Sequence, residues 1–275
     1  MAAKQRGCGP SGPVSEANKS GEQQVSARYP YNPRRSLLGD STCCCQAVAV
    51  NSEGNGAIWT IVVAAGSGSR FGAAKQFLDL AGVSVLDRSV LTAARHSDGV
   101  VVVVPPSEFA GLSLGLESSE LPDGFEWRVV TGGSTRSESV RNGLAAVPQI
   151  AEFVLVHDAA RPLASDSIFE RVIAAVSAGA DAATPVVAVT DTIRFRSGDA
   201  LDRDELVAVQ TPQAFRAEIL RRVHQQSPEA TDDVSLVSDA GGRVELVSGE
   251  QRNLKLTTPY DLEVAAFHLS SSGES

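Results

Sequence analysis

Short apolar segments alternate with segments of helical period along most of this chain. Five of the apolar segments are predicted strands, namely residues 58–64, 99–104, 127–131, 153–157 and 182–189. Runs this apolar and this rich in β-branched residues are typical of parallel strands that helices cover on both faces. Residues 84–95 carry apolar side chains at helical spacing, and a segment of helical period separates most of the strands. The alternation predicts an α/β fold with a doubly wound, mostly parallel sheet.

A polar stretch and a polar hairpin interrupt this pattern. Residues 1–56 are rich in Ser, Gly, Pro, Asn and Gln and show no sustained period. We therefore expect a disordered N-terminal extension before a single domain at residues 57–275. Residues 187–210 hold two alternating, polar runs on either side of a Ser-Gly-Asp turn at 197–199. They predict a β-hairpin arm that has little apolar surface to bury by itself.

Threonine followed by proline marks two predicted helix starts near the end of the chain. Thr211 would cap a helix that begins at Pro212. Thr258 would cap a final helix that runs to about residue 269, after a strand around Lys255. Residues 231–233 are predicted to cap a further short helix.

Composition narrows the class of protein. Of the 275 residues, 43% are hydrophobic, which is enough for a sizeable core, and no apolar stretch is long enough to cross a bilayer. We therefore expect a soluble protein without a membrane partner. The formal net charge of -9 argues against nucleic acid as a general partner.

The extension differs from the rest of the chain in charge and in cysteine content. It holds six Lys or Arg and four Asp or Glu, against 18 and 29 in residues 57–275. A basic leader of this kind is either a plastid-type transit peptide, or an upstream start or dispensable bacterial extension. Our expectation is a bacterial cytoplasmic protein. All four cysteines lie in the extension, where exposed thiols explain them better than a zinc site: Cys8, Cys43, Cys44 and Cys45.

The first predicted strand runs into a glycine-rich, basic loop. Gly66, Gly68 and Gly72 let the backbone approach a ligand closely, and Arg70 and Lys75 add positive charge. A strand that feeds such a loop presents N–H groups to an anion, most often phosphate. The spacing fits neither a Walker A loop nor a dinucleotide fingerprint. A glycine-rich surface turn is the alternative.

A second candidate segment is GGSTRSESVRNGL at residues 132–144. It follows a predicted strand and opens a helix, whose N-terminus offers free N–H groups and hydroxyls. Arg136, Ser139 and Arg141 are either ligands or ordinary surface residues of a capped helix, and for Arg141 we favour the surface position.

The segment VLVHDAARP at residues 154–162 is a predicted buried strand that ends in charged residues. Asp158 is a candidate ligand for Mg²⁺ and ribose, because Mg²⁺ binds through one or two carboxylates plus substrate oxygens. A loop salt bridge between Asp158 and Arg161 is the alternative. Lys75 and Lys255 are the two lysines of residues 57–275, against sixteen arginines, and both are next to predicted phosphate positions. A compact ammonium suits a phosphoryl oxygen.

Five motifs, taken in order, resemble those of a known family. The loop AAGSGSRFG followed by Lys-Gln resembles that of nucleotidyltransferases that activate sugars and polyols. Together with GGSTRSESVRNGL, HDAARP, QTPQAF and NLKLTTPYDL, it makes residues 58–269 resemble the 2-C-methyl-D-erythritol 4-phosphate cytidylyltransferase family. The resemblance implies a Rossmann-like fold of nucleotidyltransferase type with a protruding, dimerising β-arm. It implies that CTP and 2-C-methyl-D-erythritol 4-phosphate react, with Mg²⁺, to give 4-diphosphocytidyl-2-C-methyl-D-erythritol and pyrophosphate.

The same resemblance implies roles for single residues. Arg70, Lys75 and Lys255 would be catalytic, with Arg70 and Lys75 at the triphosphate and both lysines at the α-phosphate. The nucleotide would contact Ala64, Ala65, Gly66, Gly68, Gly133, Ser139 and Asp158, and Asp158 would also hold the metal. Arg161, Thr211, Thr192 and Arg203 would contact the methylerythritol phosphate, the last two from the arm of a second subunit. A homodimer follows. Ser134 stands where some family members carry Asp.

Two other functions remain open from the residues alone. A ribitol 5-phosphate cytidylyltransferase resembles this family in every motif. A catalytically silent nucleotide-binding dimer would keep the glycine loop but could dispense with Lys75, Lys255 and Asp158. We expect no fused cyclodiphosphate synthase domain, because the chain ends soon after its final helix.

Overall fold

The computed structural model describes residues 56–66, 71, 74–110, 112, 121–122, 125–225 and 229–271. All of them belong to one compact unit, Val48–Ser275. The predicted extension up to residue 55, its cysteines, and Gly68, Arg70 and Gly72 of the glycine loop lie outside the described residues. Within the described ranges, no helix combines the length and the apolar character needed to cross a membrane.

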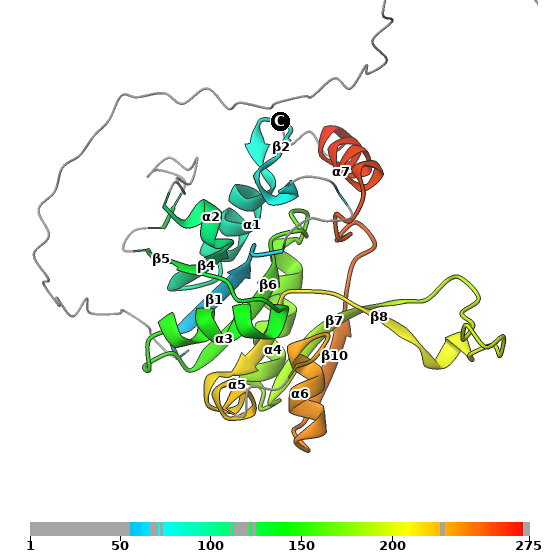
Figure 1. Cartoon of the computed structure of the whole chain (residues 1–275). Coiled ribbons are helices and arrows are strands. Elements are labelled where there is room, and N and C mark those ends of the chain that lie inside the picture. The colour runs from blue at the N-terminus through cyan, green and yellow to red at the C-terminus, as the bar shows by residue number, and fades with distance from the viewer. Residues whose placement is uncertain are drawn as a thin grey trace, which may run out of the picture. The chain divides into compact units, whose positions relative to one another are not determined.

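A central sheet organises the described residues (Figure 1). Its strands are β1 (Ile58–Val63), β4 (Gly99–Val104), β5 (Glu126–Thr131), β6 (Phe153–Asp158), β7 (Ala182–Ala188), β8 (Val207–Val209), β9 (Gln213–Arg216) and β10 (Val244–Ser248). Their order is β10-β7-β9-β6-β1-β4-β5, with β8 paired to β7. The pairs of β1 with β4 and β6, of β4 with β5 and of β7 with β10 are parallel. Strands β8 and β9 run antiparallel to their neighbours. The predicted mostly parallel α/β sheet is confirmed.

Helices cover both faces of this sheet. The described helices are α1 (Val85–Ala94), α2 (Pro106–Phe109), α3 (Arg136–Ala146), α4 (Asp166–Ser177), α5 (Ala217–His224), α6 (Asp233–Asp239) and α7 (Pro259–Ser271), and the described 3-10 turns include η1 (Lys75–Phe77) and η3 (Arg203–Glu205). Successive side chains of a strand point to opposite faces. Ile61 of β1 therefore lies in the core beneath α3, α5 and α6. Its neighbour Val62 lies in the core beneath α1 and α4.

A smaller apolar cluster fixes the end of the chain. Leu80 of the short hairpin β2 (Asp79–Leu80) and β3 (Val83–Ser84) packs with Leu269 of α7. Leu256, which comes just before α7, is fully buried in the same cluster. The cluster therefore holds the segment 253–257 against the rest of the domain.

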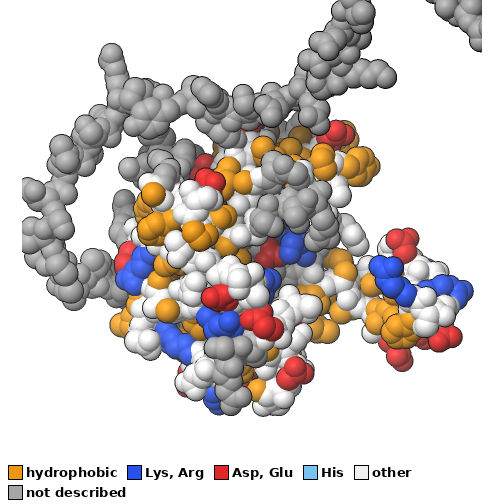
Figure 2. All heavy atoms as spheres, in the orientation of Figure 1, with side chains coloured by type: hydrophobic (Ala, Val, Ile, Leu, Met, Phe, Trp, Pro, Cys, Tyr) orange, Lys and Arg blue, Asp and Glu red, His pale blue; other side chains and the backbone are white. Residues whose placement is uncertain are grey.

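The predicted hairpin is an arm that extends away from the sheet (Figure 1). Strands β7 and β8 pair antiparallel at its base, and an isolated bridge joins Arg194 to Ala200. Gly198 makes the turn with a φ of 115°, a conformation that favours glycine. The side chains of Ile193 and Phe195 are exposed. Figure 2 shows hydrophobic and charged side chains side by side at the end of this arm.

Two local predictions were wrong. Thr211 does not cap a helix, because residues 213–216 form the inner strand β9 and α5 begins only at Ala217. Lys255 does not lie in a strand. Residues 253–257 are an extended connection, whose backbone bonds the rest of the fold through the N–H of Leu256 and the carbonyl oxygen of Ala160, 2.8 Å apart. The predicted cap near residues 231–233 is confirmed, with Asp232 accepting the Ser235 N–H at 3.2 Å.

Candidate active site

A cavity of about 500 Å³ opens where β1 and β6 end. Its described lining residues are Val63, Ala64, Ala65, Gly66, Phe71, Lys75, Gln76, Gly133, Ser134, Thr135, Arg136, Ser139, Asp158, Ala159, Ala160, Lys255 and Thr257. They come from five places: the end of β1 with the start of the glycine loop, the region of Phe71 and η1, the beginning of α3, the end of β6 and the segment before α7. Ligands of open α/β sheets bind outside the carboxyl ends of the strands, which is where this cavity lies.

Asp158 is the acidic residue of the cavity. One of its carboxylate oxygens, Oδ2, accepts a hydrogen bond from the Lys255 ammonium at 2.5 Å, and Oδ1 lies 3.5 Å from Nε of Arg136. Burial raises the pKa of this carboxyl group, but the charges of Arg136 and Lys255 outweigh burial and hold the pKa well below its usual range. The group is therefore an anion at neutral pH. The predicted alternative of a salt bridge with Arg161 is wrong, because Asp158 pairs with these two cations instead.

Both predicted lysines line the same cavity. Lys75 lies in η1, and its ammonium donates to the carbonyl oxygen of Leu256, the residue that follows Lys255. Lys255 faces Asp158 from the segment before α7. The two ammonium groups thus reach one pocket from opposite ends of the domain sequence.

The start of the glycine loop forms one wall. Ala64, Ala65 and Gly66, to which the resemblance assigns nucleotide binding, line the cavity. The side-chain amide of buried Gln76 donates to the carbonyl oxygen of Ala64 at 2.8 Å, which fixes the course of the chain as it leaves β1.

The beginning of α3 forms the opposite wall. Gly133 and Ser139 line the cavity, and the Ser139 hydroxyl accepts the Gly133 N–H at 3.1 Å. Thr135 caps the helix by accepting the Glu138 N–H at 3.1 Å. The Glu138 carboxylate reaches back to the Ser134 N–H and hydroxyl, at 2.6 and 2.7 Å. Close packing leaves no room for a side chain at position 132, where a Cβ would lie 2.2 Å from that of Ala65.

Arg136, which from the sequence alone is either a ligand or a surface residue of a capped helix, lines the cavity. It is the first residue of α3, and its side chain is 23% exposed. Besides approaching Asp158, it donates to the carboxylate of Asp233 at 2.7 Å. Burial lowers the pKa of its guanidinium, but Asp233 and Asp158 raise it by more, so the charge is secure. In the sequence, the position of Arg136 in the G-G-x-x-R motif, directly after the helix cap, is the feature that indicates a place in the cavity.

Four predicted substrate contacts do not line this cavity. Arg161 donates to the carbonyl oxygens of Asn253 and Val209, at 2.7 and 3.2 Å, and so braces the segment before Lys255. Thr211 lies beneath the cavity, where its hydroxyl accepts the Asp158 N–H at 3.0 Å. Thr192 and Arg203 are exposed residues of the arm.

The donors of the cavity suit a magnesium ion that is shared with a substrate. Among the described residues, no three His, Cys, Asp or Glu side chains gather closely enough to hold a metal by themselves. Asp158 supplies one ionised carboxylate, and Mg²⁺ commonly uses one or two carboxylates together with substrate phosphates. The arrangement therefore fits a metal whose remaining ligands are phosphate oxygens and water.

Comparison with known proteins agrees with this geometry. A family model described as IspD, 2-C-methyl-D-erythritol 4-phosphate cytidylyltransferase, matches residues 58–271. A cytidylyltransferase of that name from Rhodococcus jostii is 43% identical over 226 residues, which cover 78% of this chain and 96% of the relative. The crystal structure of 2-C-methyl-D-erythritol 4-phosphate cytidylyltransferase from Thermus thermophilus superposes with a TM-score of 0.62 at 35% identity, covering 78% of this chain and 98% of the other.

Longer proteins share the same domain. The bifunctional enzyme IspD/IspF of Nitratidesulfovibrio vulgaris is 41% identical over 223 residues, which cover 74% of this chain. The matched region spans 56% of the length of that bifunctional relative.

Proposed function

Because the chain belongs to the 2-C-methyl-D-erythritol 4-phosphate cytidylyltransferase family, we propose that it joins CTP to 2-C-methyl-D-erythritol 4-phosphate. An oxygen of the acceptor phosphate attacks the α-phosphorus of CTP. The bond from the α-phosphorus to the bridging oxygen breaks, and pyrophosphate leaves. The products are 4-diphosphocytidyl-2-C-methyl-D-erythritol and pyrophosphate, in the non-mevalonate route to isoprenoid precursors. The acceptor phosphate is already an anion near neutral pH, so no general base is required.

The convergence of both lysines on one cavity is the observation that carries this proposal. Phosphoryl transfer needs positioning and charge neutralisation more than covalent help from the protein. We assign Lys75 and Lys255 to the α-phosphate, where charge builds during transfer. Arg70 and Lys75 would bind the triphosphate. The backbone N–H groups at Gly66 and Gly68 would complete the phosphate site.

Asp158 would bind both Mg²⁺ and the ribose of the nucleotide. The bound ion would neutralise charge on the phosphate oxygens that it contacts. Ala64, Ala65, Gly133 and Ser139 would contact the nucleotide from the two walls of the cavity, which matches their place in its lining.

We further propose that the arm completes the site of a second copy, giving a homodimer. Exposed apolar residues on a projecting arm, such as Phe195, call for a partner surface. Thr192 and Arg203 are placed on this arm and outside the cavity of their own chain. They would contact the methylerythritol phosphate of the partner, while Arg161 and Thr211 would act from within the chain. The bacterial relatives favour the cytoplasm as the compartment.

The decisive experiment measures pyrophosphate release from CTP and Mg²⁺ in three parallel assays, with 2-C-methyl-D-erythritol 4-phosphate, with ribitol 5-phosphate and with no acceptor. Release with 2-C-methyl-D-erythritol 4-phosphate alone is the expected result. Release with ribitol 5-phosphate alone would mean that the protein is a cytidylyltransferase whose acceptor is ribitol 5-phosphate. The absence of release with both acceptors would favour a silent nucleotide-binding protein instead.

Variants of the lysines test the assignment of residues. Lys75→Ala and Lys255→Ala are each expected to lose on the order of 10²-fold in turnover, as when one preorganised donor is removed from an active site. Arg243→Ala is a matched control, because this exposed cation lies outside the cavity. Near-normal turnover in either lysine variant would contradict the assignment.

A further inference from the structure

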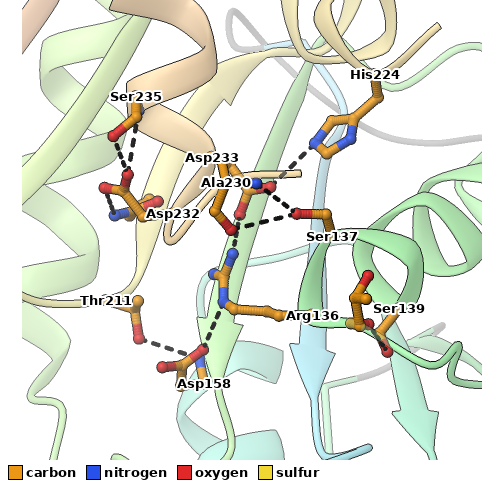
Figure 3. Close-up of polar contacts among 12 residues, drawn as sticks. Arg136, Ser137, Ser139, Asp158, Thr211, His224, Ala230, Asp232, Asp233 and Ser235 are labelled. Carbon is orange, nitrogen blue, oxygen red and sulfur yellow. Dashed lines mark hydrogen bonds and ion pairs between the residues drawn. The ribbon is translucent and has the colours of Figure 1, made fainter. Parts of the chain in front are cut away.

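Arg136 lies between two carboxylates at one end of the cavity (Figure 3). Its Nε faces Asp158 at 3.5 Å, and its Nη1 donates to Oδ2 of Asp233 at 2.7 Å. The other oxygen of Asp233 lies 3.0 Å from Nε2 of His224. We call Arg136, Asp233 and His224 the cavity cluster. The side chains of Asp233 and His224 are 1% and 2% exposed, so both lie behind the cavity wall.

Three helices meet at the cavity cluster. Arg136 begins α3, Asp233 begins α6 and His224 ends α5. A side chain in the first turn of α3 also bonds the backbone of the segment before α6. The Ser137 hydroxyl accepts the N–H of Ala230 at 3.1 Å and donates to its carbonyl oxygen at 3.3 Å (Figure 3). The position of Arg136 relative to Asp233 is thus set by the backbone as well as by charge.

A contribution to the net stability of the fold does not by itself explain why charged residues occupy these three positions. Burial raises the pKa of Asp233, but the hydrogen bond from His224 and the charge of Arg136 lower it by more, so a buried carboxylate and a partly buried guanidinium both stay charged. An apolar trio of similar volume is often at least as stable as such a group. Because Arg136 also contacts Asp158, the cluster can hold the Arg136 side chain in a defined position beside Asp158.

The two protein cations beside Asp158 have different roles in the proposed reaction. Lys255 occupies Oδ2 of Asp158, and in the proposed reaction its ammonium turns toward a phosphoryl oxygen. Arg136 then remains as the cation at the other carboxylate oxygen. A guanidinium has five donors in a rigid fork, so one held from behind by Asp233 keeps its orientation toward the cavity when a triphosphate arrives.

We propose that Asp233, supported by His224, is a positioning residue that fixes Arg136 beside Asp158 in the nucleotide site. This inference rests on the proposed function. It predicts that the charge of Asp233 matters for the handling of CTP although its side chain is buried behind the cavity wall.

The chain contains a matched control. Asp166 accepts from Nε of Arg95 at 2.9 Å and lies 2.8 Å from Nε2 of His96. We call Arg95, His96 and Asp166 the surface cluster. It has the same three side-chain types as the cavity cluster, and none of its members lines the cavity.

The experiment compares Asp233→Asn with Asp166→Asn in steady-state kinetics with CTP, Mg²⁺ and 2-C-methyl-D-erythritol 4-phosphate. Turnover by the unaltered protein is measured first, and its absence would refute the proposed function, on which this inference rests. We expect Asp233→Asn to lower kcat/KM for CTP by about tenfold or more, as for other residues that orient a functional ligand, and to raise KM. Asp166→Asn should stay within about twofold, as is usual for a surface substitution.

A double-mutant cycle separates positioning from simple structural support. In an Arg136→Met background, Asp233→Asn should have little further effect on kcat/KM, because its action passes through Arg136. If Arg136→Met does not fold, Arg136→Lys replaces it, since lysine keeps the charge but loses the fork. Melting temperatures and CTP-binding stoichiometry define the folded fraction. A lower melting temperature with unchanged kcat and KM in that fraction, or equal losses in both backgrounds, would overturn the proposal.

Discussion

The cavity cluster and the surface cluster contain the same side-chain types at similar distances. The carboxylate of the cavity cluster lies 2.7 and 3.0 Å from its Arg and His partners, and that of the surface cluster lies 2.9 and 2.8 Å from its own. Their exposure differs: the carboxylate side chain is 1% exposed in Asp233 and 52% in Asp166. Water competes for every bond of the surface cluster, so its net contribution to stability is small. In the cavity cluster, the surroundings strengthen each bond and penalise each unpaired group.

The comparison shows that contact geometry alone does not distinguish a functional cluster from a surface ion pair. Burial decides how much is lost when one member is removed. The contact between Arg136 and Asp158 decides whether removal of a cluster member also changes the arrangement of the cavity residues.

The largest expected difference concerns the arginines. Arg136→Ala leaves the Asp233 carboxylate buried without its cation and should lower the free energy of unfolding by about 3–5 kcal/mol. Arg95→Ala exposes Asp166 further to water and should lower it by about 0–1 kcal/mol. Urea denaturation at neutral pH measures both values. Equal losses in the two variants would mean that burial does not separate the clusters.

A third histidine extends the comparison to pH. Phe169 lies between the surface cluster and β6, with its ring centroid 5.3 Å from that of His96 and 5.4 Å from that of His157 in β6. Burial is the main cause that lowers the pKa of His157 to about 4. As the pH falls below about 6.5, the unfolded chain binds a proton at this residue before the folded chain does. The stability from neutral His157 is therefore fully present above that pH and is lost as the pH approaches 4.

The expected loss at His157 is about 3 kcal/mol, from 1.36 kcal/mol for each unit between the folded and unfolded pKa values. The measurement is the free energy of unfolding at several pH values between 7 and 4. His157→Gln should remove this part of the pH dependence. A profile that is the same in the variant and in the unaltered protein would contradict the prediction.

The smallest expected effect concerns salt. A double-mutant cycle between Arg95 and Asp166 should give a coupling of about 0.2–1 kcal/mol at low ionic strength. The coupling should fall toward zero at 1 M salt, where the Debye length is about 3 Å. The coupling between Arg136 and Asp233 should persist, because the pair is largely shielded from solvent. A similar decrease for both pairs would contradict the distinction that we draw.

The sequence was informative where a local pattern and the final structure obey the same rule. The apolar runs became the strands β1, β4 and β6 because uniform β-branched character suits a strand covered on both faces. The beginning of α3 could also be predicted from the sequence, because Thr135 and Glu138 form a cap with residues at most four positions away. Asp158 could be placed at the carboxyl end of its strand for the same reason.

Other features depended on partners that are distant in sequence. The segment QTPQAF carries a local helix-start signal, yet tertiary pairing makes it β9, where buried Gln213 donates to Asp232 at 3.0 Å. The alternation in NLKL has the right extended shape but lacks a ladder partner among the described strands. The cavity cluster joins three helices by side-chain contacts that no spacing rule predicts. Arg70 and Gly68 stay predictions, because they lie outside the described residues.

The late position of Lys255 in the chain has a consequence for synthesis on the ribosome. Lys255 bonds Asp158 across 97 positions and follows β10, the last strand of the sheet. A nascent chain that has emerged only as far as residue 252 already contains every described strand of the sheet. Such a chain has Arg136 as the described cation that pairs with Asp158. The cavity is thus completed by one of the last segments to be translated, and a product that ends before Lys255 contains these strands but lacks the lysine that we assign to the α-phosphate.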